Sequence, residues 1–382
     1  MQTSTITYSH PTTVLLLTLC IALVFMSGCG EVQSYKPQAV GPEGKMTVLI
    51  DSAQWNGAVG DHLREALGGP IYTLPAPEPM FDLTRGAITS QRAFDLIKRQ
   101  KNVVIVAPLS DTTTIAQFIS NRLDEGAREM VNSGVSAFIP RNNLWSRDQL
   151  VAYVTAATPE ELAGAIQERS EDLLYEFNKK TRERLQKDMF EKGRQFEIEQ
   201  VLMDKYDFAV NVQHDYLIAE DTTNFVQLRR IISSESWRSL FVYFEDNANP
   251  NDLTSEWVYT TRDSLSKLYM QGNVIGYAQI DRRRPLTTEN IDFLGKYGFE
   301  SRGLWHMVAE AEDGFEPLGM GGPFLSYAFY DEESGRNYLI DGMIFAPNYP
   351  KREFLRQLEV IAYTFRSADT SSSNDLATAA EQ

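Results

Sequence analysis

The chain has 382 residues, of which 43% are hydrophobic and 23% are charged. This composition is typical of a globular protein, and the length is sufficient for two domains. The formal net charge is -16 at pH 7, and an acidic surface of this size repels the phosphate backbone, so we expect no nucleic-acid partner. Both cysteines, Cys20 and Cys29, lie near the N-terminus, which leaves the body of the protein without a disulfide, a thiolate nucleophile or a cysteine metal ligand.

The N-terminus contains a short apolar run, residues 14–26, that is interrupted only by Thr18. A helix needs about 20 apolar residues to cross a bilayer, so residues 1–28 are instead predicted to be a secretory signal peptide. The sequence Met-Ser-Gly-Cys at 26–29 resembles the lipobox of bacterial lipoproteins. The resemblance implies cleavage before Cys29 and attachment of acyl chains such as palmitate to that residue, which would anchor the protein to a membrane.

An ordinary secretory signal remains the alternative, because Met26 stands where leucine is usual and no lysine or arginine precedes the apolar run. Residue 30 is glycine rather than aspartate, and the sorting of bacterial lipoproteins then favours the outer membrane. The sequence does not show whether the protein faces the periplasm or the cell surface. Residues 29–45 are polar and contain proline and glycine, so they are predicted to be the lipidated cysteine and a flexible tether. Residues 367–382 are predicted to form a disordered tail.

Residues 46–157 are predicted to form an N-terminal α/β domain. Apolar runs predict strands, and amphipathic runs predict helices. The strands are expected at 46–51, 103–107, 135–139 and 150–156, and the helices at 61–67, 91–99 and 115–131. Residues 74–83 contain three prolines and are expected to be extended or looped.

A long charged helix or a helical hairpin is predicted for residues 158–205. Thr158 and Glu161 are predicted to form a capping box at its start, and Pro159 suits the first helical position. Residues 178–195 carry seven lysines and arginines against three acids. The sequence does not show whether a turn near Gly193 divides the helix. The basic stretch either binds an anionic partner or is a solvated bridge between the domains, and we favour the solvated bridge.

Residues 206–366 are predicted to form a C-terminal α+β domain. Its strands are expected at 208–212, 225–229, 240–244, 275–280, 303–310, 324–330 and 338–345, and its helices at 256–269 and 351–365. The predicted fold class of the whole chain is therefore α+β, with two α/β units that contain mainly antiparallel sheets and are joined by the charged helix.

Several segments of the body resemble the DUF4837 family of Bacteroidota lipoproteins. They include LPAPEPMFDL at 74–83, Arg-Gly-Leu-Trp at 302–305, GMGGPFLSY at 319–327 and FAPNYPKREFLRQLE at 345–359. The resemblance extends over residues 46–366 and agrees with the lipobox at Cys29. The family name records an unknown function, so the resemblance implies a fold and a location rather than an activity.

The sequence contains no recognised catalytic or metal-binding motif. A Walker A loop, an HExxH motif and a GxSxG motif are absent, and the glycines of GMGGP at 319–323 are predicted to form a tight turn. We therefore expect no metal or cofactor and lean against an enzyme. The candidate binding residues are Arg282, Arg283, Arg284, Trp305, His306, Gly321, Gly322, Lys351 and Arg352.

Two of these candidates carry a more specific expectation. Lys351 and Arg352 precede the last predicted helix, at the end whose dipole disfavours cations, so an acidic partner is expected beside them. The function that we favour is a lipid-anchored envelope protein that binds or scaffolds an envelope partner without catalysis. The alternatives are an envelope hydrolase, with a site formed by 74–83, 319–324 and His306, or a carrier of lipid or small ligands.

Overall fold

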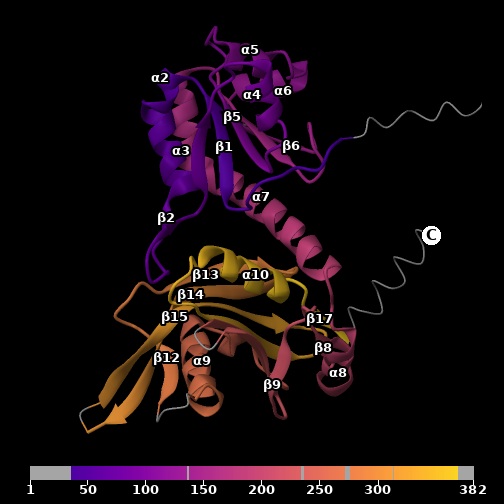
Figure 1. Ribbon diagram of the computed structural model, residues 1–382, viewed down its shortest axis with the longest axis vertical. Coiled ribbons are helices and arrows are strands. Elements are labelled where there is room, and N and C mark those ends of the chain that lie inside the picture. The colour runs from indigo at the N-terminus through magenta and orange to yellow at the C-terminus, as the bar shows by residue number, and fades with distance from the viewer. Residues whose placement is uncertain (1–35, 136, 234–235, 272–275, 313, 369–382) are drawn as a thin grey trace, which may run out of the picture.

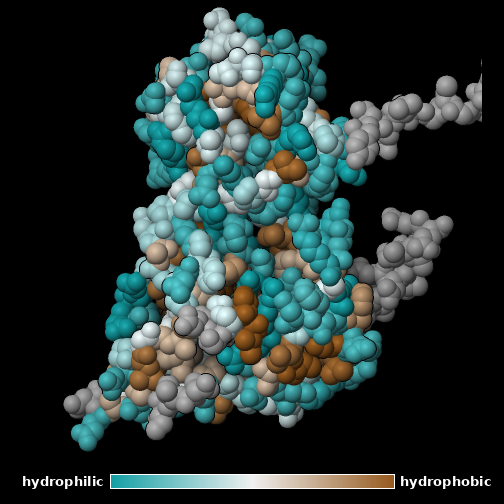
Figure 2. Space-filling model, viewed as in Figure 1, coloured by the Kyte–Doolittle hydropathy of each residue, from teal (hydrophilic) through white to brown (hydrophobic). Residues whose placement is uncertain are grey.

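The computed structural model describes residues 36–135, 137–233, 236–271, 276–312 and 314–368. Two domains lie one above the other along the longest axis, and helix α7 runs from the first to the second (Figure 1). In the view of Figure 2 the upper domain is largely hydrophilic, and apolar patches gather over the lower one. The predicted signal peptide and Cys29 lie outside the described residues.

The N-terminal domain contains a five-stranded sheet in the order β4-β1-β5-β7-β6. Four strands are parallel, and only β6 runs antiparallel to its neighbour. All residues of β5 and β7 are buried, as expected for parallel strands covered on both faces. The strands are β1 (Lys45–Ile50), β4 (Asp82–Gly86), β5 (Asn102–Val106), β6 (Phe138–Asn142) and β7 (Leu150–Val154).

Helices cover both faces of this sheet. One face packs against α2 (Ser52–Trp55), α3 (Ala58–Gly68) and the start of α7, and the other against α4 (Gln91–Ile97), α5 (Thr114–Ser120) and α6 (Glu125–Asn132). The single helix predicted over 115–131 is wrong. Asp124 accepts a hydrogen bond from the backbone N–H of Ala127 at 2.7 Å and so begins a new helix there.

The connecting segment consists of α7 (Pro159–Glu191) and α8 (Phe196–Tyr206). The predicted cap is present, because the Thr158 hydroxyl accepts a hydrogen bond from the N–H of Glu161 at 3.2 Å. The helix ends near Gly193, whose φ of +143° suits glycine alone. The segment is therefore broken at the position that the sequence left open, and α7 itself is kinked at Arg169, where φ is -130° and ψ is 18°.

The C-terminal domain contains an antiparallel sheet in the order β12-β14-β15-β16-β11-β10-β9, with β13 also paired to β14. Its strands are β9 (Leu217–Asp221), β10 (Phe225–Ser233), β11 (Ser236–Glu245), β12 (Tyr277–Ile280), β13 (Thr287–Phe293), β14 (Lys296–Ala311), β15 (Gly314–Asp331) and β16 (Arg336–Phe345). Shorter elements are β2 (Pro70–Ile71), β3 (Glu78–Pro79), β8 (Phe208–Ala209), β17 (Arg366–Ser367) and the 3₁₀ helix η1 (Pro250–Asp252).

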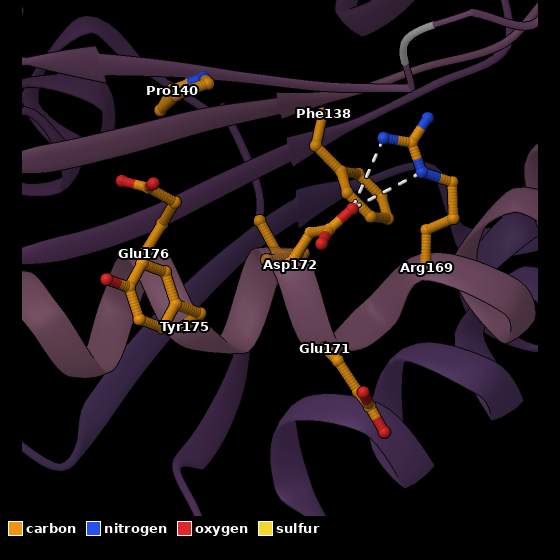
Figure 3. A pocket seen from close by; sticks show the side chains of 8 residues that line it. Phe138, Pro140, Arg169, Glu171, Asp172, Tyr175 and Glu176 are labelled. Carbon is orange, nitrogen blue, oxygen red and sulfur yellow. Dashed lines mark hydrogen bonds and ion pairs between the residues drawn. The ribbon is translucent and has the colours of Figure 1, made fainter. Parts of the chain in front are cut away.

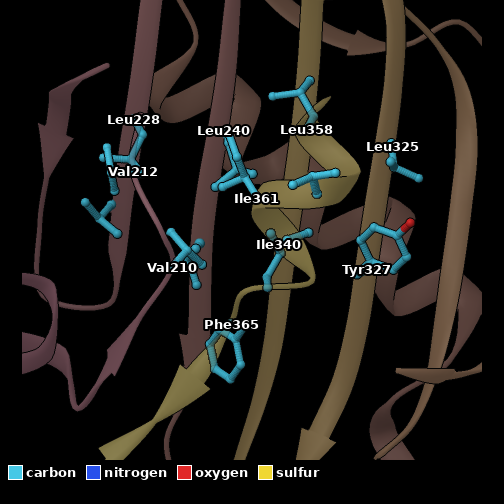
Figure 4. Close-up of a cluster of buried hydrophobic side chains, with 14 of the residues drawn as sticks. Val210, Val212, Leu228, Leu240, Leu325, Tyr327, Ile340, Leu358, Ile361 and Phe365 are labelled. Carbon is cyan, nitrogen blue, oxygen red and sulfur yellow. The ribbon is translucent and has the colours of Figure 1, made fainter. Parts of the chain in front are cut away.

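This sheet is covered by α10 (Arg352–Ala362) on one face and by α9 (Ser255–Tyr269) on the other. Figure 4 shows Leu358 and Ile361 of α10 lying over Leu240, Ile340 and Tyr327 of the sheet. The α+β class with mainly antiparallel sheets is confirmed for the chain, and its largely parallel N-terminal sheet is the part that differs. Within the described residues, no helix combines the length and apolar character needed to span a bilayer.

Three further sequence predictions need correction. Residues 36–45 are not a free tether, because Gln38 forms a β-bridge with Arg147 and Ala39 is buried. The predicted tail begins too early, since Ser367 pairs with Phe208.

The predicted turn at 319–323 is instead part of strand β15, and only Gly319 has a positive φ there. A side chain at Gly322 would clash with the carbonyl oxygen of Ile344, so this glycine is needed for close strand packing.

Candidate functional site

The two domains are fastened together at the start of α10. The carboxylate of Glu78 accepts hydrogen bonds from the backbone N–H groups of Lys351 (2.6 Å) and Arg352 (3.2 Å). These N–H groups have no partner within the helix, and the carboxylate also complements the helix dipole. The guanidinium of Arg352 donates to the carbonyl of Pro79 at 2.6 Å and pairs with Asp82 at 2.9 Å. The acidic partner expected beside Lys351 and Arg352 is thus the chain's own N-terminal domain.

Two further arginines hold the domains in place. Arg356 of α10 is buried and donates to the carbonyl of Met80 at 2.9 Å. Arg184 of α7 is also buried, pairs with Glu43 at 2.8 Å and donates to the side-chain oxygen of Asn102 at 2.7 Å. These bonds join α7 and α10 to the N-terminal domain on either side of the space between the domains.

A hollow of about 830 Å³ lies in this space. Its floor is the strip of the C-terminal sheet formed by β13 and β14, and its sides are α10 and α7. Side chains of several kinds line it. They include Thr287, Glu289, Ile291, Glu300 and Arg302 from the sheet, Leu355, Glu359 and Tyr363 from α10 and its end, and Leu174, Tyr175, Asn178, Lys179 and Arg182 from α7.

A second hollow of about 470 Å³ lies on the other side of the same turns of α7. Phe138 and Pro140 of the edge strand β6 form its far side, and Arg169, paired with Asp172 at 3.2 Å, lies at one end (Figure 3). Both hollows are lined by Glu171 and Tyr175. The two hollows thus adjoin at Glu171 and Tyr175, and we call them together the α7 groove; between them, Tyr175 is 59% exposed.

Ion pairs cross the floor of the α7 groove. Glu359 of α10 pairs with Arg182 at 2.6 Å and with Arg302 at 3.4 Å, and Arg302 also pairs with Glu300 at 2.5 Å. Burial disfavours the charged form of Glu300, but the adjacent Arg302 outweighs it and lowers the pKa of the Glu300 carboxyl. Burial also raises the pKa of Tyr363, which lies under the Arg182 guanidinium, to about 12. This network links α7, α10 and β14 with little net charge.

The basic stretch of α7 serves the protein itself. Arg182 and Arg184 pair with Glu359 and Glu43, as described above. Lys187 lies 3.6 Å from Asp148, and Arg194 pairs with Glu199 across the break before α8. Several cations of the basic stretch thus join parts of the chain, while the side chain of Lys187 is still 55% exposed. Binding of an anionic partner by this stretch stays a prediction.

The structure divides the sequence-predicted binding residues into two groups. Arg282, Arg283, Arg284, Trp305, His306, Gly321 and Gly322 lie where β12, β14 and β15 meet, and Lys351 and Arg352 lie at the domain junction. Within the first group, Arg283 pairs with Asp281 at 2.7 Å and donates to Nδ1 of His306 at 3.3 Å. Burial lowers the pKa of His306. Arg282 lies 3.4 Å from Asp263. Asp263 and Asp281 therefore neutralise much of the positive charge of Arg282 and Arg283.

The segments proposed for a hydrolase site lie in different places. Gly321 is paired with His306 across β15 and β14, whereas Glu78 and Pro79 contact the start of α10. Within the described residues, no group of three or more histidine, cysteine or acidic side chains is placed to hold a metal ion.

Sequence reasoning missed most of the α7 groove. Tyr175 gave no signal, since one aromatic residue in a long amphipathic helix is normally a packing residue. Glu300 and Glu359 look like solvated strand and helix acids. Arg302 and Glu359 lay within family-like segments, 302–305 and 345–359, but these segments pointed to a resemblance and not to a role.

The comparisons with known proteins match the two domains separately. The model of a domain of unknown function (DUF4837) matches residues 195–364, and that of a second domain of unknown function (DUF8532) matches residues 39–190. None of the curated proteins matches the chain.

Among solved structures, the Ran-binding protein Mog1p of Saccharomyces cerevisiae is 12% identical, with 43% of this chain and 92% of that chain covered and a TM-score of 0.30. A structure from Bacteroides thetaiotaomicron is 8% identical, with 42% and 45% of the two chains covered and a TM-score of 0.23. The resemblance to DUF4837, predicted over residues 46–366, is confirmed over residues 195–364, whereas residues 39–190 match the other domain model.

Proposed function

We propose that the protein is a lipid-anchored, non-catalytic binding module of the cell envelope that holds an extended segment of an envelope protein in the α7 groove. The observation that carries the proposal is the groove itself. It lies at a domain junction, where ligand sites are common, and it presents Tyr175 with its ring exposed while the ion pairs around it are satisfied within the chain. Tyrosine is enriched at protein interfaces because it combines apolar area with a polar tip.

Strand β13 supports an extended segment as the ligand. Among the described strands it pairs only with β14, so its outer row of backbone N–H and C=O groups has no strand partner there. Thr287, Glu289 and Ile291 alternate along β13 and line the groove. An extended peptide could therefore add to this edge and place alternate side chains in the hollows beside Tyr175 and Leu294.

The anchor would place this groove near a membrane. Only six residues lie between Cys29 and Lys36, where the described chain begins, and the seven Cα-to-Cα steps between them span at most about 25 Å when fully extended. Acyl chains on Cys29 would thus hold the N-terminal domain close to the bilayer surface, and Gly30 favours the outer membrane. A partner in the same envelope would then meet the groove at high local concentration.

A charge placed in the groove tests the proposal. We compare the tagged full chain with Tyr175→Glu and with a matched control, Leu268→Glu, whose exposed side chain lies on α9 over the opposite face of the sheet. After crosslinking in intact cells, the wild-type chain and the control are expected to recover the same envelope protein in similar amount. Tyr175→Glu is expected to recover at least about tenfold less, since a desolvated unpaired charge costs more than 1.4 kcal/mol.

Equal recovery by the Tyr175 and Leu268 variants would contradict the use of the α7 groove. Absence of a crosslinked partner from the wild-type chain would contradict the binding-module function as a whole.

A further inference from the structure

A smaller cavity lies on the opposite face of the C-terminal sheet, beside the end of α9. Its volume is about 190 Å³. Aromatic and methionine side chains dominate its lining, among them Trp237, Trp305, Tyr269, Met307, Met320 and Met343. It shares no lining residue with the α7 groove, so it is a separate feature of the molecule, which we call the α9 cavity.

The apolar part of the α9 cavity is well defined. The rings of Trp237 and Trp305 stack with centroids 5.5 Å apart and planes inclined by 28°. The indole N–H of Trp305 donates to the carbonyl of Ile344 at 3.2 Å, which holds that ring in place. Methionine side chains adapt readily to the shape of a ligand, and a cavity of about 150 Å³ accommodates benzene. The α9 cavity is therefore large enough for one ring or a short branched chain.

A cation without an acidic partner lies at the edge of the α9 cavity. Arg229 lines it, and its guanidinium lies 5.0 Å from the ring centroid of Trp237. Its Nε is buried and has no hydrogen-bond partner. Among the residues that the structure describes, no carboxylate pairs with Arg229, whereas the neighbouring Arg230 pairs with Asp215 at 2.5 Å. A buried guanidinium N–H without an acceptor is unfavourable, and a carboxylate matches the geometry of arginine donors.

We propose that the α9 cavity binds a small carboxylate that carries one aromatic ring or a short branched chain. The apolar group lies against Trp305 and Met343, and the carboxylate accepts hydrogen bonds from Arg229. This site requires no contact with the partner held in the α7 groove, so the two proposals stand or fall separately.

Titration of the full chain with small acids tests the α9 cavity. The probes are benzoate, 3-phenylpropanoate and 4-methylpentanoate, each compared with its uncharged primary amide. Calorimetry is expected to give a dissociation constant of about 1 mM or tighter for at least one acid. The matching amide is expected to bind about tenfold more weakly, because it lacks the charge that pairs with Arg229. Tryptophan fluorescence should change on binding, since two indoles line the cavity.

Three variants separate the apolar and the charged parts of the site. Arg229→Gln is expected to weaken the acid about tenfold and leave amide binding unchanged, which also shows that the variant is folded. Ala278→Leu fills the cavity and should weaken acid and amide alike, since Ala278 is one of its lining residues. Arg230→Gln is the matched control and should bind the acid as the wild-type chain does. The proposal is overturned if none of the acids binds at about 10 mM, if acid and amide bind equally, or if Arg229→Gln binds the acid unchanged.

Discussion

At the scale of single residues, the same residue type serves very different purposes in this chain. Arg184 and Arg356 are buried and join the domains, while Arg229 lies beside a cavity with no carboxylate among the described residues to pair with it. The sequence could not separate these roles, because Glu43, which pairs with Arg184, and Asp82, which pairs with Arg352 beside the adjacent Glu353, lie more than 100 positions away from these arginines. Local charge patterns predicted an acidic neighbour for Arg352, and the structure places Asp82 there.

The two cysteines allow a matched test of the anchor at this scale. Cys29→Ser removes the only thiol at the lipobox position, and Cys20→Ser changes a thiol inside the apolar run. Cells fed with labelled palmitate are expected to label the wild-type chain and the Cys20 variant, and the Cys29 variant should carry no label. The Cys29 variant should also leave the membrane fraction, since the acyl chains supply the binding energy. Label that persists in the Cys29 variant would contradict the anchor.

At the scale of elements, sequence patterns predicted those helices and strands that depend on nearby residues. The buried strands β5 and β7, the helix α9 and the Thr158 cap agree closely with prediction. The errors arise where distant packing decides the outcome. Strand β15 extends through Gly321 and Gly322 because these glycines allow close approach to β14 and β16. Without knowledge of the neighbouring strands, a glycine-rich run predicts a turn.

The start of α10 provides a test of an element that is capped from another domain. Replacing Glu78 with glutamine keeps the size of the side chain but removes the charge that faces the helix N-terminus. We expect a loss of about 1 kcal/mol in the free energy of unfolding, measured by urea denaturation. The control is Glu129→Gln, an exposed side chain on α6, with an expected change below about 0.5 kcal/mol. Equal effects of the two substitutions would argue against the cap.

At the scale of the whole molecule, the domains are joined by charged side chains and by an apolar contact, in which Leu74 and Ile71 pack against the core of the C-terminal domain. The α7 groove is a consequence of this arrangement, because ion pairs and helix caps hold the two domains at fixed points and leave a hollow between them. Its lining comes from segments around residues 71, 175, 291 and 359. No sequence pattern brings such segments together, so the fold class was predictable and the groove was not.

The ion pairs make stability depend on pH with a definite sign. Burial opposes ionisation of Glu199 and Glu300, but adjacent arginines outweigh it and lower both pKa values in the folded state. A carboxylate with a lowered folded pKa stabilises the protein above its unfolded pKa of about 4.3, and this stabilisation is lost as the pH falls toward the folded pKa. The melting temperature is therefore expected to stay nearly level from about pH 8 to 6.5, to decrease slightly below that as His306 titrates in the unfolded state, and to fall steeply below about pH 4. Stability that increases below pH 4 would contradict this account.

The most direct test of the central claim is site-specific photo-crosslinking in intact cells. A photoreactive amino acid is placed at Tyr175, at Leu294 or, as the control, at Leu268 on the opposite face. The account predicts one envelope protein attached at both groove positions, through residues of a single extended segment, and no such product at Leu268. Attachment at Leu268 alone, or no product at either groove position, would contradict it.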